Sequence, residues 1–137
     1  MPIKNSASHF GYYDRSSISL SNRFLINTSY SEKDSNSSYI YIHNLKNLEN
    51  TKLFLKDPIC YSRAHNIQQG NLISWFTYEN QDAFIYNDIA NNELFSCMIL
   101  PENNNLKKIK RYPLPVQVIT PKLSKAISID YFKLLHK

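Results

Sequence analysis

The residue types best suited to chemistry gather near the start of the chain, in the run His9–Asp14 (HFGYYD). The run offers an imidazole, two phenols and a carboxylate, and Gly11 would let the backbone approach a ligand closely. Aromatic faces can stack on the C–H faces of a sugar, while polar groups form directional hydrogen bonds with its hydroxyls. The run therefore predicts a saccharide-binding segment that uses His9, Tyr12, Tyr13 and Asp14. The alternative is a structural strand whose polar side chains bond to the backbone.

Two further polar groups are candidate ligand contacts. The segment His65–Gly70 leads into Trp75, and its ligand-binding candidates are His65, Asn66, Gln68 and Gln69. A primary amide both donates and accepts hydrogen bonds, which suits a neutral polar ligand. Asn87 and Asp88 are the third candidate. For the segment His65–Gly70, the structural alternative is hydrogen bonding between neighbouring sheets. For Asn87 and Asp88, the structural alternative is a turn. Trp75 itself is expected in the core.

Catalytic and metal signatures are absent from the sequence. The four histidines show no metal-ligand spacing, and no nucleophile elbow, phosphate-binding loop or dinucleotide fingerprint occurs. We therefore expect no metal and no cofactor. Asp14 could pair with Asp88 or Asp130 as glycosidase carboxylates, so the sequence leaves open whether the chain is an enzyme. Cys60 and Cys97 lack CxxC spacing, and buried free thiols are expected in preference to a disulfide.

The elements that would position these residues are β-strands. Short apolar segments with alternating faces predominate, aromatic residues make up 13% of the chain, and no long helical stripe occurs. Ile127–Leu135 could alternatively form a short helix. The pattern predicts an all-β chain with these strands: 24–30, 39–43, 52–55, 71–76, 83–88, 94–100, 108–112, 117–120 and 126–131.

Three of these segments repeat a common arrangement. Leu20–Ile26, Asn80–Tyr86 and Leu123–Ile129 each place small or polar turn residues directly before an apolar run. Their spacing approximates the 40–50 residues of a β-propeller blade. We therefore predict a partial β-propeller in one domain, 1–137, with about two four-stranded antiparallel blades and the start of a third. The expected bounds are 16–58, 68–113 and 116–132.

Four segments resemble, in order, the N-terminal portion of WD40-like and TolB-like bacterial β-propeller proteins associated with surface-polysaccharide biosynthesis genes. They are His9–Asp14, Asn66–Gly70 with Trp75, Phe84–Asp88, and Pro115–Pro121 with Ala126–Asp130. The chain departs from the usual Asp-Gly turn at Asn22 and again at Leu123–Ser124. The resemblance implies a glycan setting and a longer protein, rather than a particular reaction.

Charge and hydropathy bear on whether the chain binds nucleic acid or spans a membrane. The formal net charge is +5, and much of the excess lies in Lys107–Arg111, which is expected to be a solvated edge strand. The alternative, a patch that follows a phosphate backbone, has no accompanying nucleic-acid motif, so no nucleic acid is expected. No apolar stretch approaches the ~18 residues of a membrane span, and no secretory signal opens the chain. These features predict a cytoplasmic protein.

Three function classes follow from these observations. The leading hypothesis is a glycan-associated propeller segment that binds a saccharide or a polysaccharide precursor. The alternatives are a protein-interaction scaffold without a small-molecule site, and a fragment of a polysaccharide-processing enzyme. Because two and a half blades leave sheet faces uncovered, we also expect further blades or a protein partner. On this view the faces of 24–30 and 126–131 meet solvent in a monomer.

Overall fold

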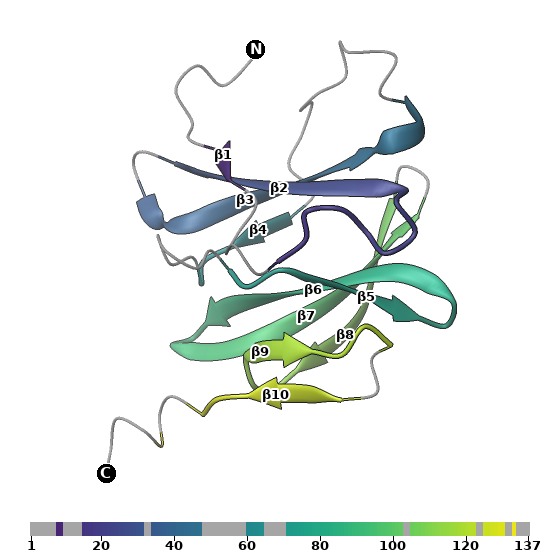
Figure 1. The fold of residues 1–137 in the computed structure, drawn as a ribbon. Helices are drawn as coiled ribbons and strands as arrows, with labels where there is room; N and C mark the ends of the chain where they lie inside the picture. Colours follow the sequence, from purple (N-terminus) through teal and green to yellow (C-terminus); the bar gives the residue numbers. More distant parts are fainter. Residues whose placement is uncertain are drawn as a thin grey trace.

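The protein is an all-β chain of antiparallel sheets. The computed structural model describes residues 8–9, 15–31, 34–47, 60–64, 71–102, 105–122, 125–130 and 133. The first sheet has the order β1-β2-β3-β4, the second has the order β5-β6-β7-β8, and β9 pairs with β10. Figure 1 shows the three sheets stacked in chain order. Their strands are β1 Ser8–His9, β2 Phe24–Ser31, β3 Asp34–Asn44, β4 Cys60–Ser62, β5 Ser74–Tyr78, β6 Gln81–Ala90, β7 Glu93–Glu102, β8 Asn105–Tyr112, β9 Val116–Ile119 and β10 Ala126–Ser128.

Most expected strands are present, with altered ends. β6 continues to Ala90, so Asn87 and Asp88 lie within the strand and the expectation that they end it is wrong. The extra length follows from pairing, because Ala90 still lies opposite Glu93 of β7. β10 is shorter than expected and ends at Ser128. The expected strand 52–55 lies outside the described residues.

Asparagine supplies turn conformations that glycine often provides. Asn91 and Asn92 have φ values of 52° and 61° and form the two-residue connection between β6 and β7. Glu79 and Asn80, with φ values of 47° and 61°, connect β5 to β6 in the same way. Two successive positive φ values define the type I′ turn, whose twist matches that of the flanking strands. These turns fix the register of β5, β6 and β7.

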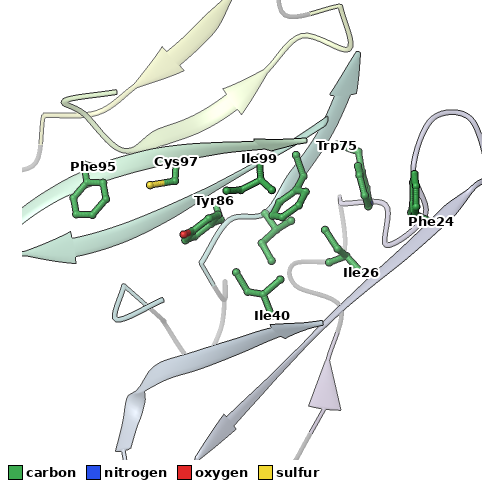
Figure 2. Packing of buried hydrophobic residues seen from close by; sticks show 10 residues of the cluster. Phe24, Ile26, Ile40, Trp75, Tyr86, Phe95, Cys97 and Ile99 are labelled. Atoms are coloured by element: carbon green, nitrogen blue, oxygen red, sulfur yellow. The ribbon is translucent and has the colours of Figure 1, made fainter. Parts of the chain in front are cut away.

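The first core lies between the first and second sheets. Phe24, Ile26 and Ile40 face the second sheet from β2 and β3. Trp75 meets Phe24 in a stacked pair at 6.3 Å between ring centroids, and it meets Phe84 edge to face at 5.5 Å. Figure 2 shows Phe24, Ile26, Ile40 and Trp75 between the two sheets. The prediction that Trp75 belongs to the core is confirmed.

The second core lies on the opposite face of the second sheet. Phe76, Ile85 and Met98 pack there against Val116 and Ile119 of β9. Side chains alternate along a strand, so Phe84 faces the first core while its neighbour Ile85 faces the second. The second sheet is therefore buried on both faces. Cys97 is a free, buried thiol within β7, as expected.

The predicted exposure of the apolar faces of 24–30 and 126–131 agrees only in part with the structure. Phe24 and Ile26 are buried, so the expectation that the apolar face of 24–30 meets solvent is wrong. That face turns toward the second sheet, which covers it. On β9 and β10, by contrast, Val118 is 50% exposed and Ile127 is 62% exposed. The lysines of β8 are solvated at the edge of its sheet, as predicted: Lys107, Lys108 and Lys110.

Candidate functional site

A pocket of about 480 Å³ lies between the second sheet and the β9–β10 hairpin. We call it the hairpin pocket. Its volume falls within the range of about 300–1,000 Å³ that is typical of small-molecule sites. Its lining comprises Tyr78, Ile85, Met98, Lys110, Tyr112, Pro113, Leu114, Val116, Ile119, Lys125, Ala126 and Ser128.

The apolar part of the pocket comes from adjacent strands in register. Ile85 of β6 lies opposite Met98 of β7, so both side chains share the face that looks toward the hairpin. Val116 and Ile119 approach from β9. These four side chains are buried members of the second core, and the pocket is therefore an extension of that core toward solvent.

Two tyrosines place phenol groups on this apolar wall. The Tyr112 hydroxyl donates a weak hydrogen bond to Met98 Sδ at 3.9 Å. The pKa of Tyr78 is raised by a hydrogen bond between its side chain and Glu79 and by the negative charge of that carboxylate. Tyr78 therefore stays protonated at neutral pH. The phenols add ring faces and neutral polar groups to a pocket whose wall is otherwise aliphatic.

Two lysines give the pocket its charge. Lys110 Nζ lies 5.0 Å from the centroid of the Tyr112 ring, within cation–π range. Lys125 approaches from the other side, where its backbone N–H donates to Thr120 Oγ1 at 3.1 Å. Neither lysine forms an ion pair with another residue in the part of the chain that the structure describes. The two ammonium groups are therefore not neutralised by a described carboxylate.

Asn87 holds the hairpin in place. Its Nδ2 group donates to the Val116 carbonyl at 3.0 Å, and its Oδ1 accepts from the Val116 backbone N–H at 2.9 Å. The side-chain amide thus reproduces a pair of ladder hydrogen bonds between β6 and β9. Asp88 Oδ1 accepts from the backbone N–H groups of Ile89 and Arg63, each at 2.8 Å. Both predicted contact residues are engaged by backbone, and their binding of a ligand stays a prediction.

The first sheet carries a separate polar and aromatic face. Ile40 and Ile42 pack toward the first core, so Tyr39, Tyr41 and His43 lie on the opposite face of β3. His43 Nε2 lies 2.8 Å from Asn27 Oδ1 of β2. Burial lowers the pKa of His43. Tyr41 is only 3% exposed, and its hydroxyl has no hydrogen-bond partner among the described residues.

The remaining predicted contacts are placed only in part. The backbone of His9 lies in β1, opposite Thr28 of β2, and so belongs to the first sheet. Seven predicted residues lie outside the described residues: Tyr12, Tyr13, Asp14, His65, Asn66, Gln68 and Gln69.

Sequence reasoning did not identify the hairpin pocket. Its members are mostly apolar or aromatic residues scattered over six strands and the turns beside them, and each has an ordinary structural explanation in the sequence. The available signal was the pair Lys110 and Tyr112, which lie two positions apart on one face of an edge strand. Only the packing of the hairpin on the second sheet brings Lys125 to the same place.

Comparison with protein-family models, curated proteins and solved structures found no match to this chain. Within the described residues, no group of three or more His, Cys, Asp or Glu side chains could hold a metal ion. The same residues include no helix that is long and apolar enough to cross a membrane.

Proposed function

We propose that this chain is a ligand-binding segment of a β-propeller-like protein, and that the hairpin pocket holds a small molecule with an apolar body. The observation that carries the proposal is a pocket of about 480 Å³ whose apolar wall continues directly from a packed core. Such pockets bind ligands by removing apolar surface from water, while a few polar groups orient the ligand.

The organisation of the sheets supports the propeller-like part of the proposal. The two larger sheets connect their strands in chain order, as antiparallel propeller blades do. The second sheet packs one face on the first sheet and the other on the β9–β10 hairpin. A blade in the interior of a propeller is covered on both faces in this manner. The sheets of the described chain do not close into a ring, so the propeller-like identity remains our inference.

Binding of a neutral apolar fluorophore tests the pocket. N-phenyl-1-naphthylamine should give a saturable fluorescence increase with the intact chain. Ala126 is an exposed residue of the pocket lining, so Ala126→Trp should fill the pocket with little effect on the core and abolish the signal. Lys108→Trp is the matched control, because Lys108 is exposed on β8 outside the pocket. Equal binding by Ala126→Trp, or no saturable binding by the intact chain, would show that the proposal is wrong.

Saccharide binding on the first sheet is a second candidate function. The observation that favours it is the face of β3 that Tyr39 and His43 share, where both aromatic side chains are partly exposed. The predicted contact His9 belongs to the same sheet by its backbone pairing.

Glycan-array binding followed by calorimetry tests this second candidate. Tyr39→Ala should weaken binding of any glycan that the array identifies, and Tyr12→Ala and Gln69→Ala should do the same if the predicted contacts are correct. Variants that lose stability but keep full glycan affinity would refute the assignment. Absence of any glycan ligand would favour the protein-interaction scaffold.

A further inference from the structure

We infer that the ligand of the hairpin pocket is a soluble amphiphilic anion, with an apolar body and one carboxylate, sulfonate or phosphate group. This inference rests on the proposed function, because it names the chemistry of the ligand for the same pocket. It assigns the apolar body to the wall formed by Ile85, Met98, Val116 and Ile119, and it assigns the anionic group to Lys110 and Lys125.

The two lysine ammonium groups are the main evidence that the ligand is an anion. Lys110 and Lys125 both line the pocket, and neither is paired with a described carboxylate. The carboxylate nearest in sequence to the pocket wall, Glu79, does not line the pocket. An apolar wall lowers the local dielectric constant, so a charge at its edge interacts more strongly with a counter-ion than it would in open water. A ligand anion would supply the missing countercharge.

The apolar wall determines the rest of the ligand. A small inorganic anion would leave Ile85 and Met98 uncovered, and a wholly polar ligand would be desolvated against them without compensating hydrogen bonds. The Tyr78 and Tyr112 rings extend the apolar surface from the wall toward Lys110. An alkyl or aromatic body with an anionic end matches this gradient from buried apolar side chains to exposed ammonium groups.

A matched ligand pair tests the inference. Decanoate and 1-decanol share an alkyl body and differ in the charge of the head group, and both displace N-phenyl-1-naphthylamine if they occupy the pocket. We expect decanoate, kept below its micelle threshold, to bind about tenfold more tightly than 1-decanol at low salt. Raising the ionic strength should reduce that preference, because exposed charge pairs are screened.

Lysine variants locate the anionic group. Lys110→Met and Lys125→Met should each weaken decanoate binding about two- to fivefold, the range expected for an exposed ion pair. They should leave 1-decanol binding unchanged, because methionine keeps an apolar stem. Lys107→Met is the control, since Lys107 lies on β8 outside the pocket.

The outcomes separate the two proposals. If the fluorophore binds but decanoate has no advantage over 1-decanol, the inference is wrong and the pocket remains a ligand site. If neither the fluorophore nor either decyl ligand binds, the proposed function itself fails. Association with anionic phospholipid vesicles without binding of free decanoate would also overturn the inference, because it would indicate a membrane surface rather than a soluble ligand.

Discussion

At the residue scale, Asn87 shows how one buried side chain can join two sheets. The sequence predicted that Asn87 either contacts a ligand or forms a turn. In the structure it lies within β6, and its side-chain amide both donates to and accepts from the backbone of Val116. A buried backbone donor and acceptor must find partners, and Val116 lies at the start of a short strand where ladder partners are few. The amide of Asn87 provides both.

Replacing Asn87 with alanine should destabilise the protein by about 1–3 kcal/mol, because two hydrogen bonds are lost and the Val116 backbone groups remain buried. Chemical denaturation measures this change. Gln81→Ala is the control, since Gln81 is exposed at the start of the same strand. A free energy of unfolding that is unchanged in Asn87→Ala would contradict the structural role assigned to this amide.

His43 makes stability depend on pH. Burial lowers the pKa of His43 in the folded state below the ordinary value of 6.5. As the pH falls below 6.5, the unfolded chain therefore binds a proton that the folded chain resists, and this residue's contribution to folding stability declines. The decline ends once the pH is below the folded pKa.

The melting temperature should therefore fall more between pH 7.5 and pH 5.5 for the native sequence than for His43→Gln. Comparison of the two proteins separates the effect of His43 from that of the other histidines, which are present in both. Equal pH dependence in the two proteins would show that burial of His43 does not control this range.

At the element scale, the second sheet is the central layer because its strands are apolar on both faces. Phe84 and Ile85 are consecutive residues of β6, yet they belong to different cores. The strict alternation of side chains along a strand produces this division. A sheet with one solvated face would instead show polar residues at alternate positions.

Truncation on either face should therefore destabilise the protein. We expect Phe84→Ala to cost about 3–5 kcal/mol and Ile85→Ala about 2–5 kcal/mol, because each leaves a cavity in a packed core. Trp75, the one tryptophan, contacts Phe84 and reports unfolding by fluorescence. The exposed-site variant Gln81→Ala again serves as the control. A mild effect at Ile85 alone would indicate that the hairpin packs loosely on the second sheet.

At the scale of the whole molecule, the stack ends in an apolar surface on the β9–β10 hairpin. Val118 lies opposite Ile127, and both side chains are at least half exposed. Exposed apolar pairs on a short antiparallel ladder favour association with another apolar surface. The expected need for further blades or a partner is consistent with this surface and stays a prediction.

The isolated chain should self-associate through this surface. Val118→Thr combined with Ile127→Thr should shift the protein toward monomer in size-exclusion chromatography, because threonine keeps β-branching and reduces apolar area. Lys107→Thr, on the edge strand β8, is the control. A clean monomer with a sharp cooperative melt from the unmodified chain would contradict both the self-association and the predicted blade count.

The sequence by itself determined the secondary structure and part of the core. Alternating apolar segments and the positions of charged residues are local signals, and they sufficed to predict most strands, the buried Trp75 and the solvated lysines of β8. The sequence could not establish the predicted saccharide contacts as firmly as it established the strands, because a polar cluster has both structural and functional explanations. Most of those residues lie outside the described part of the chain.

Only the tertiary structure decided which faces meet. Period-two alternation shows that Phe84 and Ile85 point in opposite directions, but it does not show which neighbour covers each side chain. The burial of Phe24 against the second sheet and the placement of Lys110 and Lys125 around one pocket both depend on packing between different sheets. The hairpin pocket exists because a short two-stranded ladder covers only part of a longer sheet, and that mismatch has no local signature in the sequence.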